Sequence, residues 1–342
     1  MTIKKRIMGM ALAGVMCAGM LAGCGDSSSS TASGSGAGSG GSSSSADAYK
    51  ISVIVKLTDG HFNKVIAGAQ AYADEHDNVD VEILSPTSAT AYDEQINMIE
   101  TSLGTDYDAV VISPQQSAAA ATQVANTDKV IVALDTDFDS DKKSSFVGTG
   151  NEDAAKNGGT AAVEAAKAAG IEKPTAVILT GVQGDETHDA RLEGYRAGVE
   201  EAGGEVLEVQ YCDALAEKAA TATEAVIQKY PDGVDIILST NDDMVLAAVK
   251  AVQDSGNAAF ADCIMCGFDG NQSAIEAIQE GTLTMDVAQL GYDMGYKAVE
   301  AAVNVLDGKA VDSFVDSGAE IVSSENVDDY IADMKDKGLW EE

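Results

Sequence analysis

The stretch that decides the fold runs from Ile236 to Val252 and reads IILSTNDDMVLAAVKAV. Apolar residues lead straight into a polar cluster at 239–243, and a helical pattern begins at once. A buried strand that runs directly into a helix is typical of a βαβ unit in a parallel sheet. One polar residue can cap the helix, so a cluster of this size predicts a second role for at least one other member.

The same alternation of apolar runs and helical periodicity recurs from Tyr49 onward. The expected strands are ISVIV at 51–55, VEIL at 81–84, AVVI at 109–112, VIVAL at 130–134, AVIL at 176–179, VLEV at 206–209, DIIL at 235–238 and CIMCGF at 263–268. The stretches 68–113 and 194–239 share one length and one order of helix, strand, helix and strand. We therefore predict an α/β protein of two doubly wound parallel-sheet lobes, with one large sheet as the less favoured alternative.

The composition is strongly acidic. The 342 residues include 21 Lys and Arg against 56 Asp and Glu, and the formal net charge is −35. A surface of this sign repels nucleic-acid phosphates and anionic lipid headgroups, so we predict no nucleic-acid partner. The length is enough for two domains of ordinary size.

The first residues have the layout of an export signal. A basic start precedes an apolar run from Ile7 to Ala22, which is too short to span a membrane comfortably. LAGC, ending at Cys24, resembles the lipobox of bacterial lipoproteins, whose cysteine becomes the lipidated first residue. We predict a signal peptide at 1–23, a lipid anchor on Cys24, and a flexible Gly/Ser tether over 24–47 that holds the folded part outside the membrane.

Polar clusters follow many of the expected strands. They are LTDGHF at 57–62, SPQQ at 113–116, DTD at 135–137, STNDD at 239–243 and GFDG at 267–270. In open parallel sheets, ligands bind beyond the carboxyl ends of the strands. Carboxylates and amides that bind hydroxyl pairs, with an aromatic ring against a C–H face, favour a sugar or polyol.

The folded part resembles the bacterial extracytoplasmic sugar-binding proteins of the ribose/galactose type, which are the solute receptors of ABC transporters. The resemblance covers about 49–327. It rests on VALDTDFD, FVGTGNEDAAKNGG, DARLEGYRAG, STNDDMVLAA, CGFDG and GTLTMDVAQLGYDMG in this order and spacing. It implies the type I periplasmic binding protein fold, in which three hinge crossings join the lobes.

The resemblance also implies how the chain divides between the lobes. The crossings are expected near 148–152, 288–291 and 317–321. The N-terminal lobe is then 48–150 plus 290–319, and the C-terminal lobe is 151–289 plus 320–342.

The resemblance further implies a set of cleft residues. Phe62 matches a stacking aromatic residue, and Asp135, Asn241, Asp269 and Gln289 match polar sugar contacts. Asp242 is left as the helix cap. With neighbours in the first loop and near ARLEG added, the predicted ligand-binding residues are Asp59, His61, Phe62, Asp135, Asp189, Arg191, Asn241, Asp269 and Gln289.

Several positions depart from the ribose binders. Thr136 and Asp189 stand where those proteins carry Arg, Asp59 where they often carry Asn, and His61 where they carry a second Phe. Losing cationic donors favours a different sugar, an inositol or an amine-bearing ligand. Arg191 either binds a hydroxyl or anchors the cleft by pairing with a carboxylate.

Other motifs have simpler interpretations. The aspartates of 135–141 imitate a calcium loop but lack its sixth-position Gly and twelfth-position Glu, so we predict no metal site. Cys263 and Cys266 point to opposite faces of the expected strand, which favours a role in the core. His188 is expected at the rim of the cleft. No nucleotide motif is complete, and we predict no cofactor.

The sequence thus predicts a monomeric, lipid-anchored, extracytoplasmic receptor that captures a monosaccharide or related polyol and delivers it to an ABC permease by lobe closure. It is not expected to be an enzyme. One alternative is a sensor of the same fold that signals to a membrane kinase or chemoreceptor. A second is a secreted hydrolase acting on sugars, and a third keeps the receptor role with a nucleoside or a signalling polyol as ligand.

Overall fold

The computed structural model describes residues 48–58, 60–88 and 90–340. The predicted signal peptide, the lipidation site Cys24 and the whole tether lie outside these residues, as does Asp59. None of the helices in the described part is both long and apolar enough to cross a membrane.

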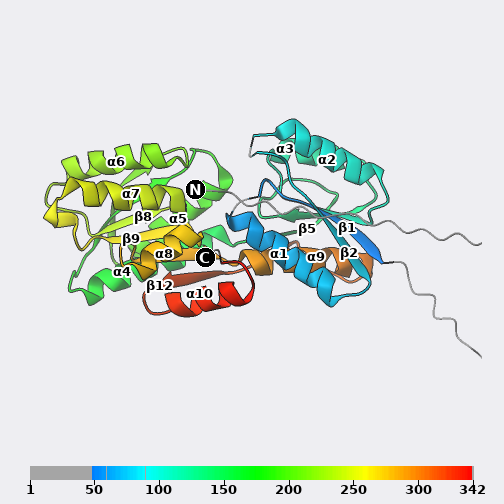
Figure 1. Cartoon of the computed structure of the whole chain (residues 1–342). Helices are drawn as coiled ribbons and strands as arrows, with labels where there is room; N and C mark the ends of the chain where they lie inside the picture. Colours follow the sequence, from blue (N-terminus) through cyan, green and yellow to red (C-terminus); the bar gives the residue numbers. More distant parts are fainter. Residues whose placement is uncertain (1–47, 59, 89, 341–342) are drawn as a thin grey trace, which may run out of the picture. The chain divides into compact units, whose positions relative to one another are not determined.

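The first lobe is built on a six-stranded parallel sheet in the order β11-β5-β4-β3-β1-β2. The strands are β1 (Tyr49–Ile54), β2 (Val79–Leu84), β3 (Ala109–Ile112), β4 (Val130–Leu134), β5 (Lys143–Gly148) and β11 (Phe314–Asp316). Helices α1 (Gly60–Glu75) and α9 (Gly291–Leu306) cover one face, and α2 (Tyr92–Gly104) and α3 (Ser117–Val124) cover the other (Figure 1). Apolar side chains on both faces explain why the central strands are uninterrupted apolar runs.

The second lobe has a six-stranded sheet in the order β12-β10-β9-β8-β6-β7, in which only β12 is antiparallel to its neighbour. The strands are β6 (Thr175–Thr180), β7 (Glu205–Tyr211), β8 (Ile236–Ser239), β9 (Ile264–Asp269), β10 (Met285–Gln289) and β12 (Ala319–Ser323). Helices α4 (Asn151–Ala168) and α5 (Glu186–Glu201) cover one face. The other face carries α6 (Ala216–Lys229), α7 (Asp242–Ser255), α8 (Gln272–Gln279) and α10 (Val327–Asp336).

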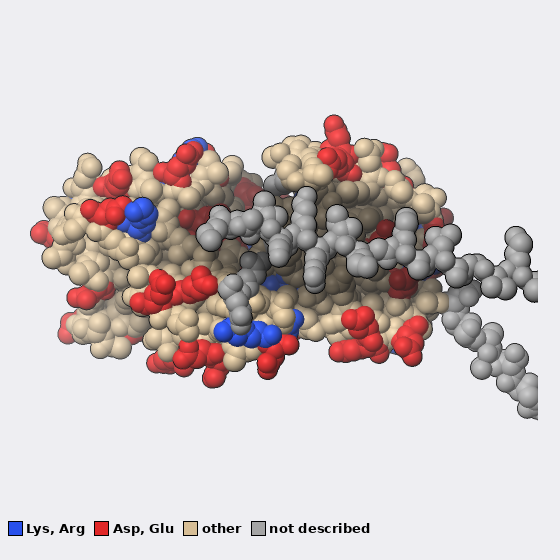
Figure 2. Space-filling view, viewed as in Figure 1, with Lys and Arg blue, Asp and Glu red and all other residues tan. Residues whose placement is uncertain are grey.

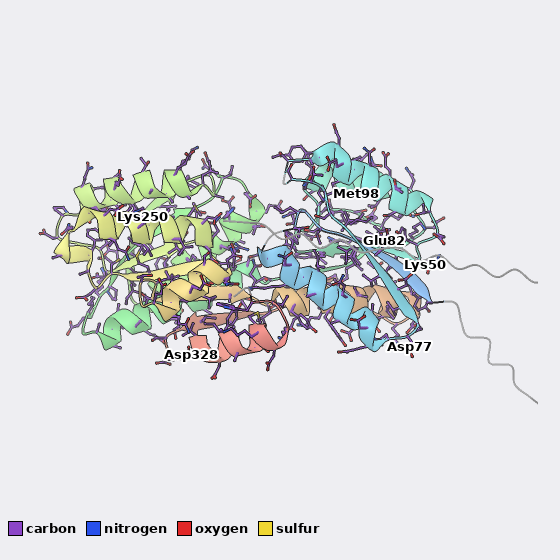
Figure 3. All side chains as sticks on the ribbon, viewed as in Figure 1. Lys50, Asp77, Glu82, Met98, Lys250 and Asp328 are labelled. Carbon is purple, nitrogen blue, oxygen red and sulfur yellow. The ribbon has the colours of Figure 1, made fainter. Side chains whose placement is uncertain are left out.

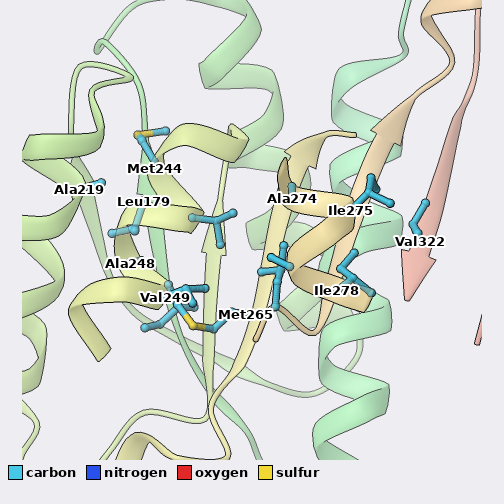
Figure 4. Close-up of a cluster of buried hydrophobic side chains, with 14 of the residues drawn as sticks. Leu179, Ala219, Met244, Ala248, Val249, Met265, Ala274, Ile275, Ile278 and Val322 are labelled. Atoms are coloured by element: carbon cyan, nitrogen blue, oxygen red, sulfur yellow. The ribbon is translucent and has the colours of Figure 1, made fainter. Parts of the chain in front are cut away.

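The stretch at 236–252 forms β8 and α7, as its pattern predicts. Figure 4 shows how α7 and α8 pack against the second sheet, with Met244, Ala248 and Ile275 completely buried. Fully burying an aliphatic side chain of this size stabilises the fold by about 1.5–3 kcal/mol. This packing holds the polar N-terminus of α7 at the carboxyl edge of the sheet.

The chain passes between the two sheets three times. It leaves the first sheet after β5, returns after β10, and leaves again between β11 and β12. The predicted fold class, two doubly wound lobes joined by three crossings, is therefore confirmed. The expected runs did not include β5, β10, β11 and β12, because these strands are polar or short, and β10 carries a buried Asp286.

Acidic side chains are spread widely over the surface. Figure 2 shows Asp and Glu scattered over both lobes on the visible face, with few Lys and Arg among them. This distribution matches the net charge of −35.

Candidate ligand-binding site

A cavity of about 420 Å³, called the cleft below, is lined by residues of both lobes. The first lobe contributes Lys56, His61, Phe62, Pro114, Gln115, Ser117, Asp135 and Thr136. The second lobe contributes Asp185, Thr187, His188, Arg191, Asp243, Asp269, Asn271 and Gln289. Most of these residues follow the carboxyl ends of strands, where parallel sheets bind ligands. The volume falls within the range of small-molecule sites.

Asp135 is the central polar residue of the first lobe's wall. It follows β4 directly and adopts a left-handed backbone with φ of 61°. His61 Nε2 lies 2.9 Å from its Oδ1, and Lys56 Nζ lies 3.2 Å from its Oδ2. The Thr136 hydroxyl donates to the same Oδ2 at 3.0 Å, and Lys56 also donates to Thr136.

The environment of Asp135 keeps its carboxyl group ionised. Burial alone would raise the pKa of Asp135, but the Lys56 ammonium and the hydrogen bond from His61 outweigh it and hold this pKa well below its ordinary value. Asp135 is therefore a fixed acceptor, and its charge is largely compensated by its neighbours.

Phe62 supplies the apolar surface of the cleft. It lies in the first turn of α1 and is only 4% exposed, between the cleft and the core of the first lobe. The His61 and Phe62 rings meet edge to face, with centroids 5.0 Å apart. An aromatic ring at this position can cover the C–H face of a sugar.

Asp269 is the matching residue of the second lobe's wall. It ends β9 with φ of 127°, a conformation that side chains rarely adopt. Arg191 Nη1 donates to Asp269 Oδ1 at 2.9 Å, and the Gln289 amide donates to the same oxygen at 2.9 Å. Asp269 is thus oriented by one cation and one amide.

Arg191 is held on all sides and lies almost entirely buried. Its guanidinium stacks on the Phe268 ring, with Cζ 3.8 Å from the centroid. Its Nε donates to Asn151 at 2.8 Å, and its Nη1 also donates to the Thr240 carbonyl at 2.9 Å. These contacts favour the role of an anchor for the cleft over that of a direct ligand for a sugar hydroxyl. Arg191 nevertheless lines the cleft.

Gln289 connects the cleft to the crossings between the lobes. It ends β10 immediately before the second crossing, and its Oε1 accepts from the Thr149 hydroxyl at 2.9 Å. Thr149 lies in the first crossing, and its hydroxyl is 3.3 Å from the Ser317 hydroxyl in the third. One buried hydrogen-bonded chain therefore joins Asp269 to all three crossings.

Two predicted site residues do not line the cleft. Asn241 is the N-cap of α7, and its Oδ1 accepts from the Met244 amide at 3.0 Å. The assignment of the cap to Asp242 is wrong, because Asn241 occupies the N-cap position and Asp242 Oδ2 accepts from the Asn271 amide instead. Asp189 lies on α5, partly exposed and outside the lining residues.

Several lining residues were missed at the sequence level. Lys56 stands between the apolar run 51–55 and the polar cluster at 57–62, so neither pattern points to it. Gln115 and Asn271 lie within or beside the quoted clusters but were not selected. His188 was expected at the rim, whereas it lines the cleft, and its Nδ1 lies 2.8 Å from the Thr240 hydroxyl.

A wider cavity of about 850 Å³ adjoins the cleft and shares five lining residues with it, Ser117, Asp135, Thr136, Asp185 and Thr187. Its wall includes Asp137, which forms an ion pair with Lys143. In the described part of the chain, no group of three or more His, Cys, Asp and Glu is arranged to hold a metal ion.

Comparisons with known proteins agree with this geometry. The profile of the periplasmic binding protein domain matches residues 51–310. The ribose import binding protein of Bacillus subtilis is 30% identical over 221 residues, which cover 64% of this chain and 69% of that protein. The D-ribose/D-allose-binding protein of Pseudomonas aeruginosa is 26% identical over 290 residues, which cover 80% of this chain and 89% of that protein.

A solved structure shares the same architecture. The carbohydrate transporter solute binding protein of Agrobacterium radiobacter, in complex with D-arabinose, superposes with a TM-score of 0.68 at 25% identity. The match covers 86% of this chain and 99% of that chain.

Proposed function

Because the chain belongs to the family of periplasmic binding proteins, we propose that it captures a monosaccharide or related polyol in the cleft and presents it to the permease of an ABC transporter. The observation that carries the proposal is a pair of aspartates, Asp135 and Asp269, that line one small cavity from opposite lobes. Each is already paired with a cation. The cleft therefore offers strong acceptors to hydroxyl groups without requiring a charged ligand.

Pentoses and hexoses are the class of ligand that we favour. One relative is named for ribose, another for ribose and allose, and a third was solved with D-arabinose. In the sequence, Thr136 stands where the ribose binders carry Arg, and the loss of this cationic donor was an argument against ribose. Lys56, which follows β1 two strands away in the sheet, donates to Thr136, so a cation stands at this place after all.

The binding step uses both lobes. We propose that Asp135 and Asp269 accept from sugar hydroxyls while Phe62 covers an apolar face. A hydrogen bond to a charged group contributes about 1.5–3 kcal/mol. A few such bonds, less the cost of ordering the ligand, give micromolar binding at about −8 kcal/mol. The ligand then favours the closed form of the lobes, which the permease recognises.

We propose that no bond of the ligand is broken. Glycoside hydrolysis needs a carboxylic acid that still holds its proton near neutral pH. Lys56 and His61 lower the pKa of Asp135 well below its ordinary value. This carboxyl group therefore carries no proton near neutral pH and cannot protonate a leaving oxygen.

The family acts outside the cytoplasmic membrane, and we propose that this chain is anchored there as a monomer through a lipid on Cys24. The LAGC motif and the Gly/Ser-rich residues 24–47 support the proposal. Mass spectrometry of the chain from a bacterial host should find acylated Cys24 as the first residue. The Cys24→Ser variant should be released from the membrane fraction, and its retention there would contradict the anchor.

The function is tested by a thermal-shift screen of D-ribose, D-allose, D-arabinose and myo-inositol. A sugar that binds only the folded state stabilises it by RT ln(1 + [L]/Kd), so the melting temperature rises with the logarithm of the free sugar concentration once this exceeds Kd. We expect at least one sugar to do so. The Asp269→Ala variant should fold but lose the shift, because both Arg191 and the ligand lose their acceptor.

Asp254→Ala is the matched control. Asp254 lies at the far end of α7 and makes only an exposed ion pair with Lys250, so its removal should leave the shift intact. A shift that survives in Asp269→Ala would place the ligand elsewhere. Conversion of the sugar to a product during incubation would favour a hydrolase.

A further inference from the structure

Two buried carboxyl groups lie directly behind the second lobe's wall of the cleft. Asp242 begins α7 and Asp286 lies in β10, and both are completely buried. Asp286 Oδ1 accepts from the Gly270 amide at 2.9 Å, and Asp242 Oδ2 accepts from the Asn271 amide at 2.7 Å. The two carboxyl groups therefore hold the backbone of the loop that follows Asp269.

The other oxygen of each carboxyl group has no hydrogen-bond donor among the described residues. Asp286 Oδ2 and Asp242 Oδ1 both face Gly267, at 2.3 and 2.6 Å from the point where a Cβ would stand. They converge on the space that this glycine leaves open. Ionised carboxylate oxygens only accept hydrogen bonds, so a proton on one group is what can join the two.

One cation from the other lobe reaches the same place. Lys64 of α1 is 7% exposed, and its Nζ donates to the Gly270 carbonyl and, at 3.1 Å, to the Tyr330 hydroxyl. Both acceptors belong to the second lobe. The loop is thus held from behind by Asp242 and Asp286 and from the first lobe by Lys64.

The charges around the pair decide how many protons it holds. Burial raises the pKa of Asp242 well above its ordinary value, and the Asp286 and Asp269 carboxyls raise it further. Burial also raises the pKa of Asp286. Lys64 opposes this rise, but burial lowers the pKa of Lys64 itself. The other titratable groups that face the pair are Tyr195 and Cys266 on one side and Tyr330 on the other.

We propose that Asp242 and Asp286 share one proton and, together with Lys64, position the ligand-binding loop Asp269–Asn271. With one proton, the pair carries a single negative charge that faces the single positive charge of Lys64. Without it, two carboxylates repel each other across Gly267, and the Gly270 and Asn271 amides lose their fixed acceptors. The pair then acts on the ligand through Asp269, and only this last step rests on the proposed function.

The pair is tested by NMR on the full chain, without any sugar present. The side-chain carboxyl carbons of Asp242 and Asp286 and the amide protons of Gly270 and Asn271 are followed from about pH 4 to about pH 10, a range that starts near the ordinary Asp pKa. We expect the two amide signals to move together at a pH far above that ordinary value. Carboxyl carbons that titrate separately near the ordinary value would overturn the proposal.

Two variants separate proton sharing from simple packing. In Asp242→Asn, the amide oxygen can still accept from Asn271 while the amide nitrogen donates to Asp286, so the loop signals should stay at their low-pH positions throughout. In Lys64→Met, loss of the cation should move the transition to higher pH. An unchanged transition in Asp242→Asn would also overturn the proposal, and the wild-type titration decides the case if this variant does not fold.

Asp254→Asn on the same helix is the control, because Lys250 and Asp254 lie on the solvent side of α7, where Figure 3 labels Lys250. It should leave the transition unchanged. Since no sugar is used, failure of the sugar screen and failure of the shared proton are separate results.

Discussion

Asp135 and Asp269 show how single residues prepare the cleft. Asp135 follows β4 and Asp269 ends β9, and each adopts a positive φ that costs conformational energy in a residue with a side chain. Each is also fixed by donors from neighbouring elements, Lys56 and His61 for the first and Arg191 and Gln289 for the second. Strain that is held in place at two facing positions is typical of a functional site.

Because Asp135 is ionised in the folded protein, the free energy of unfolding should decrease at acidic pH. A depressed pKa in the folded state stabilises the protein above the ordinary Asp pKa, and this contribution is lost as the pH falls below it. Asparagine tolerates the left-handed backbone, so Asp135→Asn removes charge without adding strain. We expect Asp135→Asn to lower the free energy of unfolding by about 1–3 kcal/mol at neutral pH.

Urea unfolding at neutral pH and near pH 3, below the ordinary Asp pKa, measures this difference. The difference in free energy of unfolding between Asp135→Asn and the wild type should be smaller at the lower pH. A gap of equal size at both pH values would attribute the effect to packing rather than charge.

Asn241 has the capping role that its residue type allows, whereas the resemblance favoured a ligand contact. Its side chain caps α7, so Asn241→Ala should lower the free energy of unfolding by about 1 kcal/mol. Sugar affinity, measured by calorimetry with the sugar found in the screen, should change little. A large loss of affinity with unchanged stability would contradict the capping role and restore a ligand contact.

The polar clusters at strand ends point to Asp135 and Asp269, and the family resemblance adds Gln289 at the end of β10; all three line the cleft. Phe62 and Arg191 lie on helices and also line the cleft, and for them the resemblance was the main signal. Lys56 reaches Thr136 from a different strand, and no spacing along the chain records that approach. Asn241 was predicted as a ligand contact, but it caps α7 and does not line the cleft. A capping residue and a contact residue look alike in the sequence at a strand–helix junction.

At the level of elements, the helices of the first lobe pack unusually close. A Cβ on Gly68 of α1 would lie 1.8 Å from the Tyr292 carbonyl oxygen of α9. No shift of a side chain can relieve a contact with backbone. This close approach positions the N-terminal turn of α1, which carries His61 and Phe62.

Gly68→Ala should therefore destabilise the fold although alanine favours helices. We expect a loss of about 1–3 kcal/mol, the usual cost of overpacking. Gly104→Ala is the matched control, because nothing lies within 4 Å of its Cβ position near the end of α2. Thermal unfolding of both variants gives the comparison, and equal melting temperatures would contradict the close packing.

Apolar periodicity predicted the elements of the core better than those at the crossings. The runs at 109–112 and 130–134 are completely or largely buried on both faces and form β3 and β4 as expected. β10 contains Asp286 and β11 is short and largely exposed, so neither has a clear hydrophobic pattern. Their strand pairing depends on the distant segments that they meet.

At the level of the whole molecule, three chain crossings connect the two lobes, and both lobes line the cleft. The three crossings are joined by hydrogen bonds through Thr149, Gln289 and Ser317. Lys64 adds a contact between the lobes behind the cleft. These links favour a hinge motion that changes the lobes' separation at the cleft while the crossings act as its axis.

The central claim is that the lobes close around an uncharged sugar held between Asp135 and Asp269. Small-angle X-ray scattering of the full chain, with and without the sugar that raises the melting temperature, tests it most directly. We predict a smaller radius of gyration with the sugar, and no change in Asp269→Ala at the same sugar concentration. An unchanged radius of gyration in the wild type at saturating sugar would contradict the account.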